Sequence, residues 1–222
     1  MDISKATRVW LACLGSAALA GTAAAADLPP PELPNYKAPP PPAWAGLYVG
    51  VNGGGAFGHS AWDSSGGFDL SGGLAGGTIG YNYHYGMAVL GIEGDVDIGR
   101  IQGTTTSACP PGCTTSNHWL ATVRGRLGYA ADRFMPYVAG GIAFGDVRAT
   151  TSGLAGGTGA PDTGWTIGAG LEFAVADAWT IRAEYLFVDL GRFNCIGCAV
   201  AAAVDNVSFT TSIVRGGIDY RF

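Results

Sequence analysis

Few side chains in this chain have the types and spacing of nucleophiles or general bases. Its three histidines are His59, His84 and His118. Ser116 stands two positions before His118, and Asp63 or Asp69 could complete a Ser–His–Asp arrangement, which activates a serine as a nucleophile. One such pair inside Ser-rich segments is weak evidence for a catalytic site. The sequence therefore predicts a protein that is not an enzyme.

Charged residues form a stronger pattern, because they alternate with apolar residues along several segments. Within 87–100, for example, acidic residues occupy every second position from Glu93 to Asp97. The pattern includes ten residues: Glu93, Asp95, Asp97, Arg124, Arg126, Glu172, Arg182, Glu184, Arg215 and Asp219. A period of two places charged side chains on one face of a β-strand and apolar ones on the other. Such a charged face could serve as an ion path or as a set of salt bridges.

Strands are needed to position these residues, and eight segments carry the alternating pattern. They are about 44–57, 73–85, 87–100, 117–130, 136–145, 163–175, 179–190 and 207–222. Tight turns at 85–87, 131–135 and 176–178 alternate with long connections at 58–72, 101–116, 146–162 and 191–206. Outer-membrane barrels combine short periplasmic turns with long extracellular loops. The sequence predicts an all-β fold, an eight-stranded antiparallel transmembrane β-barrel over 44–222. A soluble β-sandwich also has alternating strands, but it does not explain aromatic residues at both strand ends.

The two ends of the chain indicate export to the outer membrane. Residues 1–26 combine Lys5 and Arg8 with an Ala-rich apolar stretch, the layout of a signal peptide cleaved after Ala25 or Ala26. Residues 27–43 contain most of the prolines and are expected to form an extended periplasmic tether. At the other end, an apolar strand face resembles the assembly signal of outer-membrane barrels; it consists of Ile218, Tyr220 and Phe222.

Four cysteines form two close pairs, Cys109 with Cys113 and Cys195 with Cys198. In an exported protein such spacings predict disulfides. A four-cysteine zinc site has a similar spacing. The two pairs lie in different predicted loops, however, which favours two local disulfides. We expect no metal and no cofactor.

The energetics of the bilayer predict which way the charged residues face. An arginine on the lipid side of a barrel costs about 2–4 kcal/mol near the midplane, so all ten residues are expected to face the lumen. Two networks are expected, the first of Glu93, Asp95, Arg124 and Arg126, the second of Arg182, Glu184, Arg215 and Asp219. Side chains about fill an eight-stranded lumen. The sequence therefore favours a salt-bridged plug over an ion path.

Several strands resemble those of a known family. The runs are WAGLYVGVNGGGAFG (44–58), GWTIGAGLEFA (164–174), AEYLFVDLG (183–191) and VRGGIDYRF (214–222). They are similar to strands of the small outer-membrane proteins of alphaproteobacteria, known as porin-family or opacity-like surface antigens. The resemblance implies an abundant outer-membrane protein with roles in envelope integrity and surface exposure. Some members of that family are described as porins or haem binders.

The leading hypothesis is therefore an integral protein of the bacterial outer membrane with a structural, surface-exposed role. The alternatives are a small diffusion channel and a haem- or ligand-binding adhesin, for which His59 is the best axial-ligand candidate. Outer-membrane lipid, lipopolysaccharide and the barrel-assembly machinery are the expected partners. The net charge of −5 and the shortage of lysine argue against nucleic acid.

Overall fold

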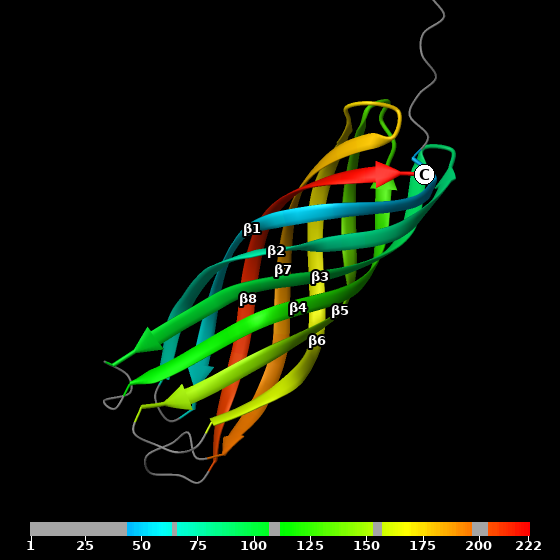
Figure 1. The fold of residues 1–222 in the computed structure, drawn as a ribbon. Coiled ribbons are helices and arrows are strands. Elements are labelled where there is room, and N and C mark those ends of the chain that lie inside the picture. Colours follow the sequence, from blue (N-terminus) through cyan, green and yellow to red (C-terminus); the bar gives the residue numbers. More distant parts are fainter. Residues whose placement is uncertain (1–43, 64–65, 107–111, 153–156, 197–203) are drawn as a thin grey trace, which may run out of the picture. The chain divides into compact units, whose positions relative to one another are not determined.

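The computed structural model describes residues 44–63, 66–106, 112–152, 157–196 and 204–222. These residues form eight antiparallel strands that close into a barrel (Figure 1). The strands are β1 (Gly46–Trp62), β2 (Gly66–Tyr85), β3 (Ala88–Thr105), β4 (Cys113–Tyr129), β5 (Phe134–Thr151), β6 (Gly157–Ala174), β7 (Trp179–Ile196) and β8 (Val204–Arg221). Each strand pairs with the next, and β8 pairs with β1. The predicted fold class is confirmed.

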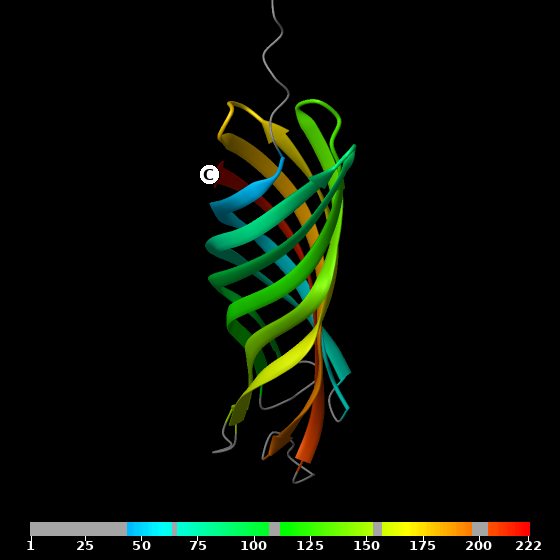
Figure 2. The ribbon, with the colours of Figure 1, turned by 90° about the vertical axis from the view of Figure 1, so that its right-hand side faces the viewer.

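The two ends of the barrel differ. At one end, called here the turn end, the strands are joined at 86–87, 130–133 and 175–178, and β8 finishes there. At the opposite end, the loop end, the connections are 63–65, 106–112, 152–156 and 197–203. The strands are tilted with respect to the barrel axis (Figure 2), as closure of a sheet requires.

The strands run further toward the loop end than the sequence predicted. Most of the Gly-, Ser- and Thr-rich segments predicted as loops are paired; in β1 and β2 the register continues to Trp62 and Gly66. Register shifts between Ile98 and Ile101, Asn117 and Leu120, and Asp189 and Arg192 interrupt the alternation. A bulge adds a residue and reverses the facing of the residues after it, so a strict period of two ends there.

The outer wall carries a continuous apolar belt. The outward residues of β3, for example, include Leu90, Ile92, Val96 and Ile98, which are 51–71% exposed. Aromatic residues mark both borders of the belt: Tyr85, Tyr129, Phe134, Trp179 and Phe222 toward the turn end, and Phe57, Phe144, Trp165 and Phe187 toward the loop end. Aromatic girdles above and below an apolar band are typical of barrels in a bilayer.

The final strand has the predicted facing. Ile218, Tyr220 and Phe222 point outward, while Arg215 and Asp219 are buried inside. The ring of Tyr220 packs edge-on against Trp179 and Phe222, with centroids 5.0 and 5.1 Å away. The Phe222 amide donates to the Leu47 carbonyl at 3.0 Å, which extends the β1–β8 pairing. An assembly role for these residues stays a prediction.

Two predicted segments lie outside the described residues, the signal peptide at 1–26 and the tether at 27–43. Those assignments stay predictions. Among the described residues, no helix is long and apolar enough to cross a membrane.

Candidate functional site

The ten charged residues identified in the sequence lie inside the barrel. Each is at most 5% exposed. With Arg221 they form what we call the central cluster, six carboxylates and five guanidinium groups joined by ion pairs. The strand register brings opposite charges side by side: Glu93 pairs with Arg124, Glu172 with Arg182, and Glu184 with Arg215.

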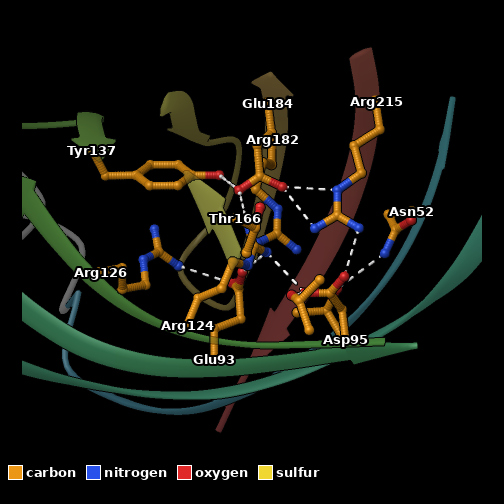
Figure 3. Close-up of polar contacts among 12 residues, drawn as sticks. Asn52, Glu93, Asp95, Arg124, Arg126, Tyr137, Thr166, Arg182, Glu184 and Arg215 are labelled. Carbon is orange, nitrogen blue, oxygen red and sulfur yellow. Dashed lines mark hydrogen bonds and ion pairs between the residues drawn. The ribbon is translucent and has the colours of Figure 1, made fainter. Parts of the chain in front are cut away.

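The central cluster is one network rather than the two expected, because its arginines also reach across the lumen (Figure 3). From β4, Arg124 binds Asp95 of β3 at 2.9 Å and Glu184 of β7 at 2.8 Å, and it also contacts Glu93. From β8, Arg215 binds Asp95 at 2.9 Å and Glu184 at 2.7 Å. In so narrow a barrel, long side chains on opposite walls meet. The prediction of two separate networks was therefore wrong.

The other predicted members join the same network. Arg126 binds Glu172, and Arg182 binds both Glu93 and Asp219, the latter at 3.1 Å. Asp97 accepts from Arg215 at 2.7 Å. A buried ion pair loses its hydration, so each carboxylate needs several donors to offset that cost. Most of the carboxylates here have at least two.

Two tyrosines that the sequence analysis did not identify complete the central cluster. The Tyr48 hydroxyl donates to Glu93 at 2.6 Å and accepts from Arg126 at 2.8 Å. The Tyr137 hydroxyl donates to Glu184 at 2.9 Å, and the Arg126 guanidinium lies 4.1 Å from the centre of the Tyr137 ring. An aromatic residue at an inward position of a strand was the available signal, since Tyr48 is out of phase with its outward neighbours.

Glycines opposite these tyrosines make room for the rings. Gly80 pairs directly with Tyr48, and Gly170 pairs with Tyr137. A methyl group built on either glycine would overlap the tyrosine ring. The phenol and its hydrogen bonds to charged groups thus depend on a missing side chain on the neighbouring strand.

We therefore expect Gly80→Ala to destabilise the barrel by about 1–3 kcal/mol, the usual cost of overpacking. The Tyr48 ring is 2% exposed and cannot move away without losing Glu93 or Arg126. Gly94→Ala is the matched control, because its methyl group would lie 3.8 Å from the nearest atom. Urea unfolding in lipid vesicles measures both; equal stability of the two variants would contradict the argument.

Apolar residues fill the lumen on both sides of the central cluster. The loop-end layer includes Trp62, Leu70, Leu186, Phe209 and Ile213, all at most 3% exposed. The turn-end layer consists of Trp44, Val89, Met135 and Ala174. Trp44 is held by a 3.2 Å hydrogen bond from its indole nitrogen to the Asp132 carbonyl, and Arg221 lies 4.9 Å from its ring. The described interior thus has three layers: two mainly apolar ones, which include a few buried polar side chains such as Ser60 and Thr115, and the charged central cluster between them.

The remaining candidates are dispersed. His59 lies on the outer wall, where its Nδ1 atom is hydrogen-bonded to Asp69 Oδ1 at 3.0 Å. Ser116 and His118 lie on β4, and Asp63 accepts from Asn206 at 2.9 Å. The structure does not bring them together as a Ser–His–Asp arrangement. His84 lies near the turn end, in β2.

The cysteine prediction falls partly outside the described residues. Cys113 and Cys195 are buried in the loop-end layer. Cys109 and Cys198 belong to segments that the structure does not describe. The two local disulfides therefore stay a prediction.

Comparison with known proteins finds that this chain is similar to outer-membrane proteins. Residues 11–222 match the model of the outer membrane protein beta-barrel domain. A 31 kDa outer-membrane immunogenic protein of Brucella melitensis is 36% identical over 204 residues, covering 81% of this chain and 84% of that protein. A 22 kDa outer membrane protein of Rhizobium leguminosarum is 32% identical over 155 residues, 69% of this chain and 68% of that protein. The solved structure of Neisserial surface protein A is 15% identical, with a TM-score of 0.46, over 80% of this chain and 98% of that one.

Proposed function

We propose that this chain, which belongs to the outer membrane protein beta-barrel domain family, is a non-conducting envelope protein with a structural, surface-exposed role. Its location in the bacterial outer membrane and its likeness to surface antigens follow from its relatives. The observation that carries the proposal is the filled lumen. A solute would have to pass two apolar layers and the central cluster between them.

The apolar layers and the central cluster each oppose passage through the lumen. Water and ions do not enter an apolar layer that is packed to the density of a protein interior. In the central cluster, moving a guanidinium group aside would leave carboxylates buried without partners, at a cost of several kcal/mol. Both barriers act in series along the same axis.

A small diffusion channel is the second candidate, and one observation favours it. Among the described residues, Asn52 Oδ1, Asp97 Oδ1 and Asp219 Oδ2 are buried without a hydrogen-bond partner. Such groups attract water. With six carboxylates to five guanidinium groups, the central cluster would admit cations rather than anions.

A deletion strain separates the two candidates. If the role is structural, loss of the protein should increase sensitivity to detergent and to large apolar antibiotics, while uptake of small hydrophilic solutes stays unchanged. A plasmid copy of the wild type should restore resistance. Slower solute uptake with unchanged detergent resistance would instead support the channel. We further propose that the barrel-assembly machinery inserts the chain and that outer-membrane lipid surrounds its apolar belt.

A further inference from the structure

A shallow groove on the outer wall crosses the loop-end border of the apolar belt. It has a volume of about 450 Å³ and lies over β7, β8, β1 and β2. Phe57 and Phe187 form its apolar part. Polar groups adjoin them in the register: Phe57 pairs with Ser71 and Ser212, and His59 in the next row pairs with Asp69 and Thr210. Along the membrane normal, the groove therefore changes from apolar, at the two phenylalanines, to polar, toward the loop end.

The polar part of the groove presents neutral and acidic groups. His59 Nδ1 lies 3.0 Å from Asp69 Oδ1, and their side chains are 53% and 94% exposed. The imidazole lies over Gly67, where a methyl group would overlap its Nε2 atom. The Ser212 hydroxyl is 3.0 Å from the Tyr185 hydroxyl. The hydroxyl and imidazole groups can donate and accept hydrogen bonds, and the Asp69 carboxylate accepts them.

The chemistry of the lining indicates the ligand. No lysine or arginine is among the described residues that line the groove, and a phosphate headgroup would call for such a residue. Hydroxyl, imidazole and carboxylate groups suit the many hydroxyl groups of a sugar. At this height of the wall, the adjoining molecules are the lipids of the outer leaflet, whose acyl chains would lie along Phe57 and Phe187.

We propose that this groove binds the sugar headgroup of an acylated glycolipid of the outer leaflet. The sugar hydrogen-bonds to His59, Asp69 and Thr210, and one acyl chain descends over the two phenylalanines. Since the groove lies on the outside of the barrel, the inference holds whether or not the lumen conducts.

Native mass spectrometry of the folded protein in micelles tests the proposal with three probes. They are a diacylated diglucosamine lipid without phosphate, phosphatidylglycerol with the same acyl chains, and the free diglucosamine. We expect the glycolipid to bind about tenfold more tightly than phosphatidylglycerol, because a few hydrogen bonds to its sugar contribute about that much binding free energy. We expect a similar preference over the free diglucosamine, because only the glycolipid places an acyl chain against the apolar part of the groove. Equal binding of phosphatidylglycerol would overturn the sugar assignment. Equal binding of the free sugar would overturn the lipid assignment.

Substitutions locate the site. His59→Ala and Asp69→Asn should each weaken glycolipid binding about five- to tenfold. Gly67→Ala should do the same by displacing the imidazole, without removing any polar group. His118→Ala, which removes a histidine on β4 outside the groove, is the matched control and should bind like the wild type. Heat-modifiable migration verifies that each variant is folded. Unchanged glycolipid binding in the first three variants would overturn the proposal. It would also be overturned if the wild type formed a dimer and these three variants were monomeric, because the groove would then be a contact between two copies of the chain.

Discussion

Arg124→Met is expected to lower the free energy of unfolding by about 3–5 kcal/mol, the cost of leaving buried charges without a partner. Arg124 is 1% exposed and contacts three carboxylates, those of Glu93, Asp95 and Glu184. Methionine replaces the aliphatic part of the side chain, so the lost charge is expected to contribute more than the vacated space of the guanidinium group. Urea titration of the barrel in lipid vesicles measures the change.

A second substitution tests the electrostatic origin of this effect. Arg124→Met together with Glu184→Gln restores the charge balance of the central cluster. The amide oxygen of the glutamine can still accept from Arg215, and its amide nitrogen can donate to the Tyr137 hydroxyl, which can accept as well as donate. The double variant should recover a large part of the lost stability, giving a coupling energy of the size found for contacting residues. A double variant that is no more stable than the single one would show that charge balance does not govern the cluster.

Phe209→Ala should have an effect of similar size, about 3–5 kcal/mol, for a different reason. Phe209 is 1% exposed and belongs to the loop-end layer, so truncation leaves a cavity in a packed interior. Phe57→Ala is the matched control, because Phe57 is 62% exposed on the outer wall and lipid can occupy the vacated space. The same unfolding experiment compares the two, and equal losses would contradict a packed layer inside the barrel.

The sequence was sufficient to predict the fold and the facing of the charged residues. Period-two alternation depends only on the local geometry of a strand, and the bilayer strongly penalises charge on the outer side. Glu93, Asp95 and Arg124 could thus be placed in the lumen without coordinates. In the structure all three are buried inside the barrel and are 1–3% exposed.

Connections across the lumen could not be predicted in the same way. The contact of Arg124 with Glu184 joins residues 60 positions apart on β4 and β7, and it depends on barrel diameter and stagger rather than on any local pattern. The phase of Tyr48 in its strand indicated that it faces inward, but the room for the Tyr48 and Tyr137 rings depends on glycines of neighbouring strands, which a local pattern does not reveal.

The extension of the strands was missed for a compositional reason. Gly-, Ser- and Thr-rich segments are typical of loops, yet here they continue the sheet and bury residues such as Trp62 and Leu70 on its inner face. The bulges in β3, β4 and β7 then disrupt the period from which a strand is identified.

Single-channel recording in a planar bilayer tests most directly the central claim, that the lumen is plugged. Protein folded in detergent, lacking residues 1–26, is added to the bilayer, and a general diffusion porin serves as the positive control. A lumen closed by the central cluster and two apolar layers predicts no steady conductance at moderate voltage, although heat-modifiable migration shows that the barrel is folded. Large, steady and cation-selective conductance of the wild-type protein would contradict the plug and establish the channel instead.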